Sequence, residues 1–183
     1  MKQRGFTLIE LLVVVFLITL ISGISIANFR SGEKRRAVAL ASDTVISAIR
    51  TAQNYALTGK KTNNANGACR SAEFYWIEFA YATPTAMTLS AENTCGSVDL
   101  IETYILPARS QIRAGGLSLN GSAAITDLSI IFYPPFGTLE AMVDDTGSTS
   151  PVSFTTATII VETSEGDISK SITIDGVAGR IGE

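Results

Sequence analysis

The sequence of 183 residues contains no histidine, the side chain that proteins use most often as a general base and as a metal ligand. Its two cysteines, Cys69 and Cys95, are too few and too far apart for a zinc ribbon or a C-x-x-C redox centre. A phosphate-binding glycine loop is also missing. These absences exclude most hydrolase, zinc and redox-enzyme classes, so we expect no enzymatic activity, no cofactor and no metal.

Basic side chains are scarce as well. The chain has 14 Lys and Arg residues against 17 Asp and Glu residues, which gives a net charge of −3. A protein dedicated to binding nucleic acid is usually strongly basic. The charge therefore argues against that class and leaves nucleic acid as an improbable partner.

The apolar residues are concentrated near the start. The stretch from Phe6 to Phe29 contains one charged residue, Glu10, and follows a short basic peptide, Met1–Gly5. As a helix it would be about 36 Å long, enough to span a bilayer core of roughly 30 Å. Three interpretations compete: a secretory signal peptide cut near Ser25–Ala27, an uncleaved membrane anchor, or a leader that is removed while the helix is kept.

Glu10 discriminates among these interpretations. A carboxylate in the middle of a bilayer costs about 2.5–3.5 kcal/mol, and neither a signal peptide nor a simple anchor gains from that cost. Cleavage after Gly5 would create an α-amine on Phe6, four residues before Glu10 and on the same helix face. The amine of a neighbouring helix could serve equally well and would fix the axial register between subunits, because an unpaired buried charge is expensive.

The run Gly5-Phe6-Thr7-Leu8-Ile9-Glu10, followed by Leu11–Val15, resembles the leader of type IV pilins and type II secretion pseudopilins. The resemblance implies cleavage between Gly5 and Phe6 by an inner-membrane prepilin peptidase, with N-methylation of Phe6. It implies that Glu10 guides the subunit into a helical filament of other pilins or pseudopilins, on an inner-membrane assembly platform. Many major pilins have a helix-kinking proline later in this segment, where this chain has Gly23.

The resemblance also implies a location. Before assembly the chain would cross the inner membrane once, in contact with lipid, with its bulk in the periplasm; afterwards it would be part of a pilus or pseudopilus. Positive charges lie on both sides of the apolar stretch, so the positive-inside rule does not decide the orientation of the chain in the membrane. We interpret the cluster on the outer side as a solvated or headgroup-level face; it consists of Arg30, Lys34, Arg35 and Arg36.

Beyond this cluster the helical pattern continues. Small and apolar residues recur at steps of three and four from Val38 to Ala56, and Gly59 with Lys60 and Lys61 predicts the end of the helix. We therefore expect four segments: a leader over 1–5, a transmembrane and assembly helix over 6–29, an amphipathic continuation over 30–60, and a globular head over 61–183.

The head has the pattern of short β-strands separated by turns. We expect strands over residues 73–82, 86–89, 99–106, 127–133, 152–163 and 167–174, with a hairpin turn at Glu165-Gly166. In the first of these, alternation places Phe74, Trp76 and Glu78 on one side and Tyr75, Ile77, Phe79 and Tyr81 on the other, which indicates a buried central strand rather than a ligand platform. The predicted fold class is α+β: a long N-terminal helix packed on a mostly antiparallel sheet.

Three further segments resemble H-type minor pseudopilins and FimT-like minor pilins, the GspH/FimT type. They are the helix end Ala48–Gly59, the strand and turn Ile130–Thr138, and the closing strand with its Gly-Arg turn, Ile172–Ile181. Their order and spacing imply a minor subunit, although each also fits a strand or helix that ends in a turn.

Export implies oxidising conditions, under which Cys69 and Cys95 would form a disulfide closing a loop of about 26 residues; two free buried thiols are the alternative. Asp144 and Asp145 could help to bind calcium, but adjacent acids in a polar loop are more often solvated turn residues.

The preferred function is therefore that of a structural subunit that polymerises through its N-terminal helix. The alternative is a filament-tip subunit that acts as an adhesin or captures DNA. Loss of Lys2 and Arg4 on cleavage would leave 12 basic residues against 17 acidic ones, a net charge of −5, and Lys170 and Arg180 make a poor basic strip for DNA. A single-pass sensor with an uncleaved helix is a distant third.

Overall fold

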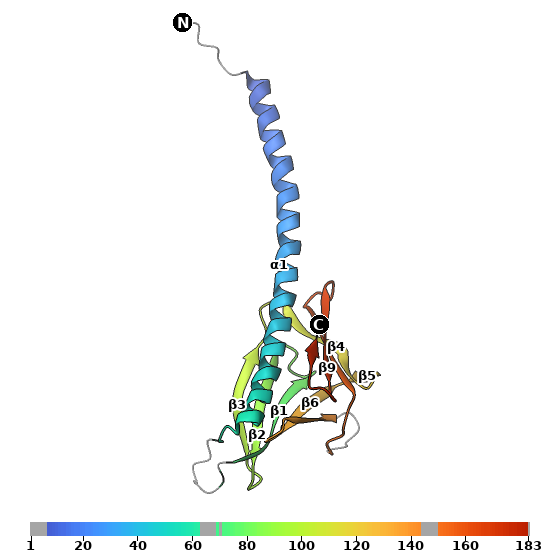
Figure 1. The fold of residues 1–183 in the computed structure, drawn as a ribbon. Helices are drawn as coiled ribbons and strands as arrows, with labels where there is room; N and C mark the ends of the chain where they lie inside the picture. Colours follow the sequence, from blue (N-terminus) through green and yellow to red (C-terminus); the bar gives the residue numbers. More distant parts are fainter. Residues whose placement is uncertain (1–6, 63–68, 70, 144–149, 183) are drawn as a thin grey trace. The chain divides into compact units, whose positions relative to one another are not determined.

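The computed structural model describes residues 7–62, 69, 71–143 and 150–182, with the backbone alone for 24–29, 123 and 124. The chain forms two compact units, Met1–Arg36 and Ala37–Glu183. One α-helix, α1 (Leu8–Thr58), contributes its first part to the first unit and the remainder to the second (Figure 1). The helix continues through Gly23 without interruption.

The end of α1 is fixed by a glycine cap. Gly59 adopts a left-handed conformation with φ of 62°, and the Lys60 N–H donates to the carbonyl of Tyr55 at 3.2 Å. This is the hydrogen bond of a Schellman motif, which satisfies a carbonyl that the helix leaves without an intrahelical donor. The Lys60 ammonium also lies 3.7 Å from the centroid of the Tyr55 ring. The helix end predicted from the Gly59 pattern is confirmed.

The second part of α1 packs on β-structure through a face of small residues. The buried side chains of this face are Val38, Ala41, Val45, Ala48, Ile49, Ala52 and Ala56. Because most of them are alanine, the helix can approach the strands closely, and these residues belong to one core cluster with both sheets. Near the helix end, the rings of Tyr55 and Tyr75 lie 6.2 Å apart.

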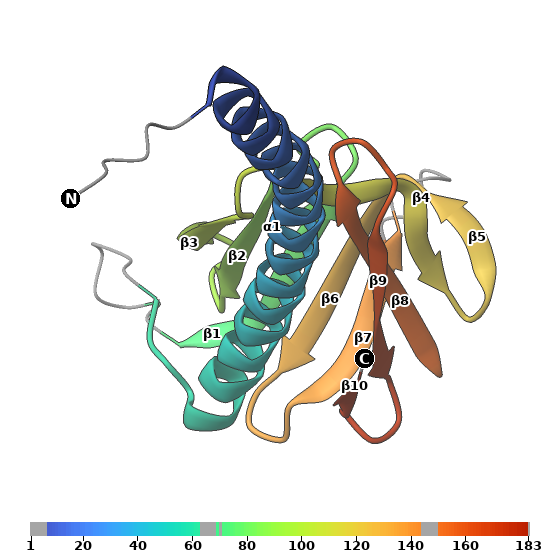
Figure 2. The same ribbon diagram turned by 90° about the horizontal axis from the view of Figure 1, so that it is seen from above.

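Within the described residues, ten strands form two five-stranded sheets, and the pairings within them are antiparallel. The first sheet has the order β3-β2-β1-β6-β7, with β1 (Ala72–Ala80), β2 (Ala86–Asn93), β3 (Val98–Ile105), β6 (Asp127–Tyr133) and β7 (Thr138–Val143). The second has the order β10-β9-β8-β4-β5, with β4 (Ser110–Leu119), β5 (Ser122–Ile125), β8 (Thr156–Thr163), β9 (Ser169–Asp175) and β10 (Ile181–Gly182). Figure 2 shows β3 and β5 at opposite sides of this unit. The predicted α+β class is confirmed, and the strands are divided between two sheets.

The strand β1 occupies the centre of the first sheet, as its alternation predicts. Tyr75, Ile77 and Phe79 are at most 1% exposed and face the helix side, whereas Trp76 on the other face is half-buried. The prediction was wrong for Tyr81, which is 56% exposed. The strand ends at Ala80, and Tyr81 begins a turn, where its N–H donates to the Thr126 carbonyl at 3.0 Å and to the Asp127 carboxylate at 3.2 Å.

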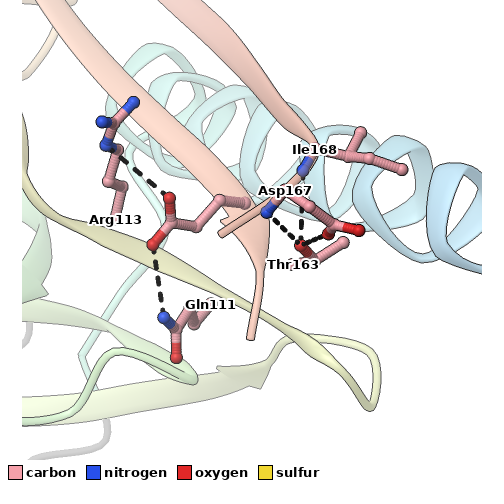
Figure 3. Close-up of polar contacts among 6 residues, drawn as sticks. Gln111, Arg113, Thr163, Asp167 and Ile168 are labelled. Atoms are coloured by element: carbon pink, nitrogen blue, oxygen red, sulfur yellow. Dashed lines mark hydrogen bonds and ion pairs between the residues drawn. The ribbon is translucent and has the colours of Figure 1, made fainter. Parts of the chain in front are cut away.

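The predicted hairpin of β8 and β9 is confirmed, with Gly166 in its turn at a φ of 74°. The Thr163 hydroxyl donates to Asp167 and accepts from the N–H groups of Asp167 and Ile168, so the turn is closed by a side chain (Figure 3). Next to it, the 8% exposed residue Glu162 accepts from Gln111 at 3.3 Å and lies 3.6 Å from the Arg113 guanidinium.

The turn between β9 and β10 is organised by Asp175. Its carboxylate accepts hydrogen bonds of 2.9 Å from the N–H groups of Val177 and Ala178. Both hydrogen bonds, with the one from Ala178 the larger contributor, lower the pKa of Asp175 below its ordinary value because they favour the charged form.

This shift predicts a pH dependence. A carboxyl whose pKa is depressed in the folded state stabilises the fold above its unfolded pKa, and the contribution is lost as the pH falls through the folded value. We expect Asp175→Asn to unfold at a lower denaturant concentration than the wild type at pH 7, with a difference that shrinks below about pH 4. Urea unfolding of the full chain in detergent at pH 7, 5 and 3 measures this. A difference that persists undiminished at pH 3 would contradict the assignment.

Candidate functional site

The carboxylate that the sequence singles out lies at the start of α1. The Thr7 carbonyl accepts from the N–H of Glu10 at 3.1 Å and of Leu11 at 3.3 Å. Thr7 is therefore the N-cap residue, and Glu10 is the third helical residue, near the positive end of the helix dipole. Thr7 and Glu10 have the T-x-x-E spacing of a capping box. The sequence analysis did not use this spacing, although it was readable from the sequence.

The side chains that follow Thr7 are apolar and exposed. The most exposed is Leu8 at 82% and the least is Val14 at 44%. The set is Leu8, Ile9, Leu11, Leu12, Val13, Val14, Val15, Phe16, Leu17, Ile18, Leu20 and Ile21. These residues cover all sides of the helix, and a helix that is apolar all round is normally buried against protein or lipid. The first unit therefore presents an apolar surface suited to packing against similar helices.

Two hydroxyls within this segment bond to the helix itself. The Thr19 hydroxyl donates to the carbonyl of Phe16 at 2.8 Å, and the Ser22 hydroxyl donates to the carbonyl of Ile18 at 2.7 Å. Each polar group is thereby satisfied within its own helix, which removes the cost of placing it in apolar surroundings.

No helix among the described residues combines the length and the apolar composition that crossing a membrane requires. The span expected over residues 6–29 therefore stays a prediction. Gly5 and Phe6 lie outside the described residues, so their cleavage, the methylation of Phe6 and its pairing with Glu10 stay predictions too.

Cys69 and Cys95 form a disulfide, with their Cα atoms 5.8 Å apart. Cys95 lies in the turn between β2 and β3, which is built around the buried Asn93. The Asn93 side-chain oxygen accepts from the N–H of Cys95 at 3.0 Å and of Ser97 at 3.1 Å. The bridge joins this turn to the segment that follows α1, and it confirms the predicted pairing.

The three segments behind the finer resemblance meet in space. A Cβ on Gly137, in the β6–β7 turn, would lie 3.3 Å from Leu57 of α1. A Cβ on Gly179, in the β9–β10 turn, would lie 3.3 Å from both Gln53 of α1 and Leu139 of β7. Together they border a hollow of about 560 Å³. The helix end and both turns thus form one corner of the second unit.

The remaining candidate residues are the acids Asp144 and Asp145 and the cations Lys170 and Arg180. Asp144 and Asp145 lie outside the described residues, and the described ranges contain no group of three or more acids or cysteines placed to hold a metal ion. Lys170 lies in β9, and Arg180 is exposed in the turn after it, where it also lowers the pKa of Asp175. Arg180 is thus a surface residue.

Comparison with known families gives one result. Residues 1–26 match the prokaryotic N-terminal methylation motif, while no curated protein and no solved structure matches the chain. The motif supports a type IV pilin-like or pseudopilin structural subunit rather than an enzyme. It implies processing by a prepilin peptidase and assembly with other pilins, and it suggests a membrane-anchored subunit that later enters a filament.

Proposed function

We propose that the chain is a minor pilin or pseudopilin of a type IV pilus or type II secretion pseudopilus. A prepilin peptidase cuts it between Gly5 and Phe6, Phe6 is N-methylated, and the subunit polymerises through its N-terminal helix. In the filament, Glu10 pairs with the Phe6 amine of its own or a neighbouring helix.

The observation that carries this proposal is the start of α1. A carboxylate lies in the first helical turn, within the residues that match the methylation motif, and large apolar side chains surround it on the helix surface. Such a surface needs lipid or other helices to cover it, and the carboxylate needs a cation when that happens. Phe6 stands four residues before Glu10 in the sequence, so the amine that cleavage creates there would supply that cation.

The second unit supports the remainder of the proposal. Its disulfide fits an oxidising compartment such as the periplasm, to which insertion through residues 6–29 in the inner membrane would deliver it. Its α+β fold, a helix packed on antiparallel strands, is consistent with pilins. The convergence of the helix end with the β6–β7 and β9–β10 turns supports the GspH/FimT-type minor subunit, because the three resembling segments form one structural corner.

The mass of the mature N-terminus tests the proposal. We expect the chain isolated from membranes of its natural host to lack Met1–Gly5 and to carry a methyl group on Phe6. Replacing Gly5 by valine is expected to block processing, because the branched side chain stands at the bond to be cut. Intact-mass and N-terminal peptide mass spectrometry measure both. An initiator methionine on the native chain, or a fully trimmed Gly5→Val product, would refute the leader assignment.

A further inference from the structure

The strand β3 forms an open edge of the first sheet. It pairs with β2 along one side, and no described strand pairs with the other side. Figure 1 shows β3 at the margin of the second unit. The outer backbone N–H and C=O groups of such a strand are a ready template for a further strand.

The other sheet edges are short or covered. The strand β10 has two residues and β5 has four. The outer side of β7 is occupied at Ala141, which exchanges hydrogen bonds of 2.9 and 2.8 Å with Val152. With eight residues, β3 is the longest edge left open among the described strands.

The side chains of β3 make this edge apolar. Val98 is 57% exposed, Leu100 is 62% exposed and Ile105 is 75% exposed. Leu100 lies opposite Ser90, which lies opposite Trp76 of the central strand. An added strand would therefore extend this row of side chains, and its own apolar residues would cover Leu100.

The charged side chains of β1, β2, β3 and the turns between them have one sign. Between Arg70 and Arg109 the chain contains five acids and neither Lys nor Arg. Two of these acids, Asp99 and Glu102, belong to β3, and Glu92 lies opposite Val98 on the neighbouring strand. Pairing with the β3 of a second copy would bring like charges together, whereas a basic strand would meet carboxylates.

We propose that β3 is a docking strand for an extended segment of a partner protein that carries Lys or Arg side chains. The segment adds to the first sheet beside β3 and its backbone pairs with the open edge. Its apolar residues cover Leu100, and its cations lie near Asp99 and Glu102 on the other face of the sheet. This interaction goes beyond filament assembly, because it uses the sheet edge and not the N-terminal helix.

Binding of a fluorescent peptide with alternating lysine and valine to the full chain in detergent micelles tests the proposal. We expect binding that weakens as salt is added, together with protection of β3 amides from hydrogen exchange. A peptide of alternating glutamate and valine is expected not to bind. Leu100→Lys is expected to weaken binding of the basic peptide at least about tenfold, since an edge lysine blocks strand pairing and repels the ligand.

Val177→Lys is the matched control, because Val177 is also an exposed apolar residue (82%) but lies in the β9–β10 turn. This variant is expected to bind like the wild type. Equal binding of both peptides, no binding of the basic one, no protection of β3, or an unaffected Leu100→Lys variant would each overturn the proposal. Self-association that Leu100→Lys abolishes would assign the edge to a second copy instead. None of these outcomes depends on N-terminal processing, so the filament proposal is tested separately.

Discussion

Glu10→Val is expected to be cleaved and methylated like the wild type but to be largely missing from filaments. Removing one partner of a buried charge pair costs about 3–5 kcal/mol, and 3 kcal/mol corresponds to roughly a hundredfold change in an equilibrium. We therefore expect incorporation of the variant to fall by about that factor, because the Phe6 amine would be buried without its carboxylate. Quantitative immunoblots of sheared filaments and of membranes measure the ratio.

Two further variants separate charge pairing from helix capping. Glu10→Gln keeps an oxygen that can accept a hydrogen bond at the start of the helix but has no charge. If pairing with the amine is the cause, Glu10→Gln fails to assemble as Glu10→Val does; if capping is the cause, it assembles. Glu33→Gln removes the same charge elsewhere in α1 and is expected to assemble normally. Normal incorporation of Glu10→Val would contradict the pairing argument.

Gly176→Ala is expected to destabilise the second unit much more than the same substitution at Gly182. A Cβ at this position would lie 2.2 Å from the Phe154 carbonyl oxygen and 2.7 Å from its ring. One of these atoms belongs to the backbone, so the clash cannot be relieved by rotating a side chain. Forcing extra atoms into a packed site costs about 1–3 kcal/mol, a large part of a typical total stability of about 5–15 kcal/mol.

Urea unfolding of the full chain in detergent, followed by near-ultraviolet circular dichroism, measures this loss. Gly182→Ala is the matched control, since a Cβ there would meet nothing within 4 Å, and it is expected to change the stability by less than about 0.5 kcal/mol. A Gly176→Ala variant as stable as this control would show that the approach of Gly176 to Phe154 is looser than the structure has it.

Local patterns in the sequence predicted the features that depend on neighbouring residues. The cap at Gly59, the alternation of Tyr75 with Trp76, and the turn at Gly166 each follow from a few adjacent side chains, and each is found in the structure. The motif around Glu10 was readable for the same reason, because Gly5 to Glu10 are six consecutive residues.

The features that the sequence did not predict depend on distant residues or on interrupted patterns. The strand β4 was missed because four residues, 113–116, bulge opposite Ile160 of β8 and break the alternation. This bulge requires glycine at position 116, because a Cβ there would lie 2.7 Å from the Arg113 side chain. The division into two sheets and the meeting of Leu57 with Gly137 result from pairings across the chain, for which no local signal exists.

The hydroxyls of Thr19 and Ser22, which donate to carbonyls of their own helix, bear on how a subunit leaves one apolar medium for another. Neither hydroxyl has to break its hydrogen bond during such a transfer. These two positions therefore add little to the free-energy cost of moving the helix from lipid into a protein environment. If the chain polymerises through this helix, these hydroxyls would not help to select a neighbour. The axial position of each subunit would then depend on side-chain packing and on Glu10, the one carboxylate among these apolar residues.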